Sequence, residues 1–161
     1  MFTTTQFCII ISLIKSKEVI FLNIEVNYLA VLVAAVVSMA LGFLWYSPMV
    51  LGKPWMKLKG YTPETLKKAQ KEMGPFYAVS FVFALITAYV LTHVMTLSQN
   101  FYGYPEMQTG LMTAFFAWGG FMLPVQVTST IFGDKKWALL AIDTGYQLVS
   151  LLAMGLVIAY L

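Results

Sequence analysis

The stretch WALLAIDTGYQLVSLLAMGLVIAY, at residues 137–160, decides the fold of this chain. Its only charged residue is Asp143, and every other position is apolar, small or uncharged. A helix needs about 20 predominantly apolar residues to cross the hydrocarbon core of a bilayer. A buried helix of a soluble protein is the weaker interpretation, so we predict that this stretch spans a membrane.

Three more stretches upstream share this pattern. They carry no charged residue, and they cover residues 26–52, 73–105 and 107–133. Each is long enough to cross the bilayer as a helix. The chain is therefore predicted to be all-α, an integral membrane four-helix bundle. The predicted spans lie at about residues 28–46, 76–97, 109–132 and 137–160.

The composition agrees with a membrane protein and excludes several functions. Hydrophobic residues make up 60% of the chain and charged residues 11%, whereas a soluble domain carries about 25% charged residues. All 10 basic residues are lysines, so the bidentate arginine contacts that suit nucleic acid are missing. With a single cysteine, Cys8, and a single histidine, His93, we expect no metal site. No nucleophile–base pair is visible, so we expect neither a cofactor nor an enzyme.

The lysines predict the orientation in the cell membrane. They gather in the first loop, at Lys53, Lys57, Lys59, Lys67, Lys68 and Lys71, and in the third loop, at Lys135 and Lys136. The second loop, residues 98–108, has none. Because basic loops stay on the cytoplasmic side, loops one and three are predicted to be cytoplasmic. The second loop and both termini are then outside.

The first loop also predicts a short amphipathic helix between spans one and two. Thr62 suits the N-cap, Pro63 the first helical position, and Gly74 followed by Pro75 suits a stop. Two interpretations stay open, a helix that lies on anionic lipid and an ordinary solvated linker helix.

The N-terminal residues 1–24 fit neither a span nor a signal peptide. Their apolar run at residues 7–14 is too short to cross the bilayer and precedes its lysines, whereas a signal peptide has the opposite order. Either this segment is a flexible or interfacial extension, or translation starts later, near Ile24. The remaining residues, 25–161, are predicted to form one membrane domain.

Small residues predict where the helices pack. In span one they recur every four residues and form one helical stripe, at Ala30, Ala34, Ser38 and Gly42. Because helices associate in lipid through close backbone approach, the stripe predicts a packing face. The packing could be within the chain or between two chains.

Polar residues inside the spans predict one site. Asp143 lies about 9 Å from the inner end of span four, and Gln126 about 8 Å from that of span three, counted from the rise of a helix. Gln147 lies one turn beyond Asp143, and Ser80 has a similar depth in span two. We therefore predict an intramembrane polar cluster of Ser80, Gln126, Asp143 and Gln147.

Asp143 supports two interpretations. A carboxylate inside a span is costly and therefore faces the bundle interior or water. It could bind a proton or cation during transport, or it could be a hydrogen-bonded strut between helices.

Two motifs carry a resemblance to a known family. The segments GFLWYSP at residues 42–48 and GKPWM at 52–56, together with IDTGYQLV at 142–149, are similar to the DUF1761 family. The resemblance implies a small four-span membrane protein and brings no activity. Besides Asp143, it marks Trp45, Tyr46, Ser47, Pro48, Trp55, Gly145 and Tyr146. We interpret Trp45 and Tyr46 as anchors at the membrane interface, and Pro48 as the stop of span one.

These observations favour a structural or accessory membrane protein. Its expected partners are the lipid bilayer and either a second copy of the chain or another membrane protein. The alternative is a small oligomeric transporter or channel that uses Asp143 for proton or cation coupling.

Overall fold

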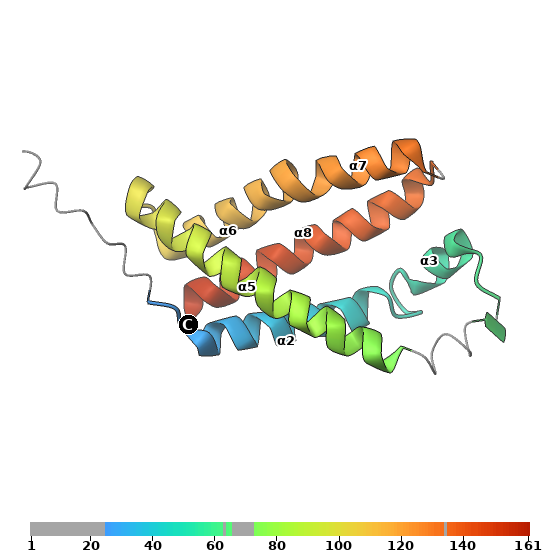
Figure 1. Ribbon diagram of the computed structural model, residues 1–161, viewed down its shortest axis with the longest axis horizontal. Helices are drawn as coiled ribbons and strands as arrows, with labels where there is room; N and C mark the ends of the chain where they lie inside the picture. Colours follow the sequence, from blue (N-terminus) through green and yellow to red (C-terminus); the bar gives the residue numbers. More distant parts are fainter. Residues whose placement is uncertain (1–24, 63, 66–72, 134) are drawn as a thin grey trace, which may run out of the picture.

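A computed structural model describes residues 25–62, 64–65, 73–133 and 135–161. Four helical segments in this part of the chain are long and apolar enough to cross a membrane. They are α2 (Tyr28–Trp45), α5 (Gly74–Tyr102), α8 (Trp137–Tyr160) and a third span built from three joined pieces, α6 (Glu106–Ala117), η1 (Trp118–Met122) and α7 (Leu123–Phe132). The predicted all-α four-span fold is confirmed (Figure 1). Residues 1–24 lie outside the described part, so both interpretations of them stay predictions.

The ends of the spans follow local sequence signals. Asn27 caps α2, because its side-chain oxygen accepts hydrogen bonds from the amides of Leu29 and Ala30. The helix ends at Trp45, before Pro48, as predicted. α5 runs beyond the predicted end at residue 97 and stops at Gly103, whose φ of +66° suits glycine.

Consecutive spans run antiparallel, and α8 lies at the centre of the packing. It contacts α6 on one side and α2 on the other, and α2 also packs against α5 (Figure 1). The Asn27 side chain donates to the carbonyl oxygen of Leu161 at 3.1 Å, which joins the start of α2 to the end of α8.

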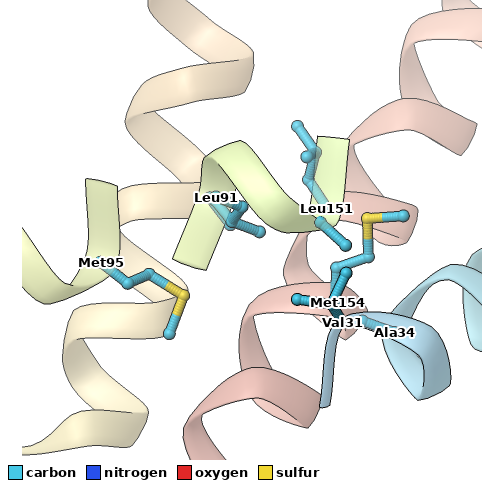
Figure 2. Packing of buried hydrophobic residues seen from close by; sticks show 8 residues of the cluster. Val31, Ala34, Leu91, Met95, Leu151 and Met154 are labelled. Carbon is cyan, nitrogen blue, oxygen red and sulfur yellow. The ribbon is translucent and has the colours of Figure 1, made fainter. Parts of the chain in front are cut away.

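The core is built from small side chains and methionines. Figure 2 shows Val31 and Ala34 of α2 together with Leu151 and Met154 of α8. Ala30, Ala34 and Ser38 of the predicted small-residue stripe are buried inside the chain's own bundle. The stripe therefore packs within the chain.

The closest helix crossing joins α6 and α8. A Cβ atom added at Gly110 would lie 2.5 Å from the carbonyl oxygen of Gly155, and one added at Gly155 would lie 2.6 Å from that of Gly110. Only glycine fits at both positions, because the obstacle is backbone that a side-chain rotation cannot move.

The third span contains a π-helical turn. The amide of Leu123 donates to the carbonyl of Trp118, five residues back. Pro124 follows directly, and a proline ring clashes with the carbonyl four residues before it, at Gly120. The wider π turn accommodates this clash.

The short helix that the structure describes between the first two spans is α3 (Gly52–Lys59), which the sequence analysis did not predict. It ends at Gly60 with a φ of +75°. The predicted helix lies further along, and only its start is described. There the amide of Thr65 donates to Thr62 Oγ1 at 3.3 Å, which confirms Thr62 as a cap. Residues 66–72 of that helix lie outside the described part.

Candidate functional site

The candidate site begins with a tight corner after α2. The amide of Leu51 donates to the carbonyl of Trp45 at 3.1 Å, and that of Gly52 to Ser47 at 2.8 Å. A Cβ atom at Gly52 would lie 2.3 Å from the carbonyl oxygen of Tyr46, so the corner needs glycine. The corner leads into α3 and turns it back toward the bundle.

This corner brings two aromatic donors to one carboxylate. Tyr46 Oη donates to Asp143 Oδ1 at 2.9 Å, and Trp55 Nε1 donates to the same oxygen at 3.0 Å. The two rings contact each other edge to face, with centroids 5.3 Å apart. Both donors are neutral, and all three side chains are half-buried. We call Tyr46, Trp55 and Asp143 the aromatic clasp.

The residues around the clasp lock α2 onto α8. Trp45 Nε1 donates to the carbonyl oxygen of Ile142 at 3.1 Å. Its ring lies over Gly145, where an added Cβ atom would come within 3.3 Å of the indole. Trp45 and Tyr46 therefore turn their polar atoms toward α8. Backbone and carboxylate acceptors of α8 satisfy both side chains, and their interpretation as anchors at the membrane interface stays a prediction.

Tyr146 fastens the same pair of helices one turn further along α8. Its hydroxyl donates to the carbonyl oxygen of Ser38 at 3.3 Å. Its ring lies against Gly42, where an added Cβ atom would be 3.0 Å from the hydroxyl oxygen, and contacts the ring of Tyr46 at 5.3 Å. The segments 42–56 and 142–149 thus dock on each other.

A family model described as a protein of unknown function, DUF1761, matches residues 29–159. The chain belongs to the DUF1761 family. The match includes both segments of the clasp and nearly all of the four spans. No curated protein and no solved structure matches the chain. Membership of DUF1761 confirms the resemblance and assigns no activity.

The DUF1761 chain divides the predicted polar cluster between two places. Gln126 and Asp143 line a hollow of about 560 Å³ between α7 and α8, which we call the α7–α8 hollow. Ser80 instead lines a second hollow, beside α2 and α3. Equal depth did not place Ser80 in the hollow that Asp143 lines. The predicted grouping of all four residues was therefore wrong for Ser80.

Gln147 and Ser47 are the polar residues of this region that lack partners. The side-chain oxygens of both, Gln147 Oε1 and Ser47 Oγ, are buried and have no hydrogen-bond partner among the described residues. The polar side chains of Trp45, Tyr46, Trp55, Asp143 and Tyr146 are all engaged in hydrogen bonds.

Two polar contacts of α8 were missed by the sequence analysis. Trp118 Nε1 donates to the carbonyl oxygen of Thr144 at 2.9 Å, and the hydroxyls of Ser38 and Ser150 lie 2.7 Å apart. The first connects the π turn to α8. The contact between Ser38 and Ser150 could have been predicted from the sequence. Ser150 lies one helical turn beyond Gln147 and has a similar depth in span four to that of Ser38 in span one.

The remaining titratable candidate, His93, lies apart from the clasp. Its Nδ1 is 2.9 Å from the carbonyl oxygen of Tyr89 in the preceding turn of α5, and the two rings are in contact. Within the described residues no group of three or more His, Cys, Asp and Glu side chains could hold a metal ion. The described site is an assembly of hydrogen bonds and ring contacts between helices.

Proposed function

We propose that this chain is a non-catalytic membrane protein that binds a second copy of itself through α7, with Asp143 as a structural strut. The observation that carries the proposal is that α7 is left uncovered by the rest of the bundle. No residue of α7 or η1 is buried, whereas α2, α5, α6 and α8 all bury residues.

The strut role rests on the geometry of the clasp. Both donors reach the same oxygen of Asp143 and come from the α2–α3 corner, so the carboxylate ties that corner to α8. A hydrogen bond to a charged group is worth more than one between neutral groups. The strut therefore fixes one end of the bundle and leaves α7 free to meet a partner.

The binding role rests on what α7 presents. Gln126, Ser129 and Thr130 line the α7–α8 hollow. Polar side chains and close packing drive helix association in lipid. The same hollow is lined by Asp143 and Lys135, so it carries both signs of charge. In a two-fold dimer the same surface of both copies meets, so the positive group of one copy can face the negative group of the other. This favours a second copy of the chain as the partner.

Disulfide cross-linking in membranes tests the proposal. In a Cys8→Ser background, Ser129→Cys is compared with Val82→Cys, a 53% exposed position of α5. Mild oxidation should give a dimer with Ser129→Cys and none with Val82→Cys. Equal dimer yields at both positions, or no dimer at Ser129→Cys, would contradict the proposal.

We also propose that the end of the bundle with α3 and Lys135 faces the cytoplasm. Both lysine-bearing connections lie at this end, opposite the C-terminus (Figure 1). A cysteine at Lys57, in the same Cys8→Ser background, should react with a membrane-impermeant maleimide only after cells are opened. Labelling of this cysteine in intact cells would show that the opposite orientation is correct.

The alternative function is proton or cation transport, favoured by the hollow that Asp143 shares with Gln126. Against it, the core around Leu91, Ala114 and Met154 fills the bundle between the helices. In liposomes, Asp143→Asn should abolish pH-driven or cation flux if Asp143 carries the ion. Absence of such flux in the wild type, or unchanged flux in the variant, supports the strut.

A further inference from the structure

A second hollow, which we call the aromatic hollow, lies between the end of α2, α3 and the start of α5. Its volume is about 460 Å³. The clasp residues Tyr46 and Trp55 form part of its wall, and Ser80 belongs to it as well. Most other lining residues are aromatic or methionine, namely Met39, Phe43, Met56, Tyr61, Met73, Phe76, Tyr77 and Tyr146.

Such walls suit a flexible apolar chain. Methionine side chains are unbranched and polarisable, so they adapt to irregular apolar ligands. A hollow of this size and apolar character with a few polar groups is typical of a ligand site. The lining hydroxyls that have no hydrogen-bond partner among the described residues are those of Tyr61, Tyr77 and Ser80.

Lysines flank the aromatic hollow on the α3 side, while Asp143 lies behind its wall and accepts the hydrogen bonds of Tyr46 and Trp55. α3 carries three lysines, and its residues Trp55 and Met56 line the hollow. Lys59 lies on the same side of the helix, with its Nζ 5.6 Å from the centre of the Trp55 ring. No acidic residue lines the hollow. A ligand with an apolar chain and an anionic head complements this arrangement.

We propose that the aromatic hollow binds one anionic phospholipid of the surrounding bilayer. An acyl chain lies between the aromatic and methionine side chains, and the phosphate meets Lys59, with Ser80 and Tyr77 as hydrogen-bond donors near the head. The hollow lies at the lysine-bearing end of spans α2 and α5, and lysines near the end of a span favour the headgroup level of a bilayer. The proposal is independent of self-association through α7.

Native mass spectrometry of the full-length protein in detergent tests the preference for an anionic headgroup. Phosphatidylglycerol and phosphatidylcholine with identical acyl chains are titrated, and phosphatidylglycerol should bind more tightly. Lys59→Gln should lower that preference about fivefold, since one lysine near an anionic lipid surface contributes about 1 kcal/mol. Lys135→Gln removes the same charge at the same end but outside the aromatic hollow, and it should keep the preference.

A substitution that fills the aromatic hollow tests whether it binds the acyl chain. Ser80→Trp fills the hollow and should remove retention of both lipids, whereas Val79→Trp, at an exposed neighbouring position outside the lining, should retain them. Thermal unfolding of each variant checks that it folds. Equal binding of the two lipids by the wild type would overturn the proposal. Equal effects of Lys59→Gln and Lys135→Gln on the preference for phosphatidylglycerol would also overturn it. Undiminished lipid retention in a folded Ser80→Trp variant would do the same.

Discussion

Removing the donors of the clasp one at a time should reveal a coupled pair. Tyr46→Phe deletes the 2.9 Å hydrogen bond to Asp143 and keeps the ring, and Trp55→Phe deletes the 3.0 Å bond. Hydrogen bonds to charged groups contribute about 1.5–3 kcal/mol in soluble proteins, whereas polar contacts between membrane helices average about 0.6 kcal/mol. For these half-buried groups we expect each single variant to lower the free energy of unfolding by about 1 kcal/mol.

The double variant should cost more than the sum of the single ones. After either single change, Asp143 Oδ1 keeps one donor, but after both the carboxylate is left without a donor in the bundle. Leaving a polar group unpaired costs about 1–3 kcal/mol, so we expect a coupling energy of about 1 kcal/mol. In an Asp143→Asn background the coupling should shrink, because a neutral amide oxygen loses less when its donors are removed.

Equilibrium unfolding in mixed micelles measures these free energies. Helicity from circular dichroism is the suitable signal, because Trp55 itself contributes to the fluorescence. Independent sites add within about 0.3–0.5 kcal/mol, which sets the resolution of the test. A double variant whose cost equals the sum within that margin would refute the strut. So would an Asp143→Leu variant as stable as Asp143→Asn, because leucine leaves both donors without an acceptor.

Two further predictions concern the packing of α8. Gly155→Ala would place a Cβ atom 2.6 Å from the carbonyl oxygen of Gly110, so thermal unfolding should show a loss of about 1–3 kcal/mol, while Gly119→Ala, with no atom within 4 Å, should be near neutral. Ser38→Ala leaves the buried hydroxyl of Ser150, 2.7 Å away in the wild type, without its partner. It should therefore destabilise by about 1–2 kcal/mol, and the double change of both serines to alanine should recover part of that loss, measured in the same unfolding assay. A double variant less stable than either single variant would contradict this account.

The spans were predictable because the lipid core imposes a simple rule of length and charge. The rule of length and charge did not predict α3, because eight residues with three lysines resemble a solvated loop. Its signals were the glycine at Gly60 and the lysines Lys57 and Lys59 in the last turn, which favour a helix C-terminus. A short helix such as α3 is recognised only from these terminal signals, because hydropathy does not mark it.

The candidate site was only half predictable for a geometric reason. The rise of a helix gives the depth of a residue, and a short connection makes two spans neighbours. Both conditions held for Gln126 and Asp143, which line one hollow. Depth alone does not say which hollow a side chain lines, and Ser80 was misplaced for that reason. The donors of Asp143 were missed because a corner, rather than a continuous helix, brings Trp55 back to α8.

The contacts explain why the motif residues occur together. Gly52 permits the corner, the corner places Trp55 beside Asp143, and Gly145 leaves room for the ring of Trp45. Each of these residues makes a packing or hydrogen-bonding contact that depends on its neighbour. Together, these contacts hold α2 against α8. Ser47 differs, because its buried hydroxyl has no partner among the described residues. A buried polar atom without a partner costs free energy, so Ser47, together with Gln147 of the second segment, is where a role beyond docking should be sought first.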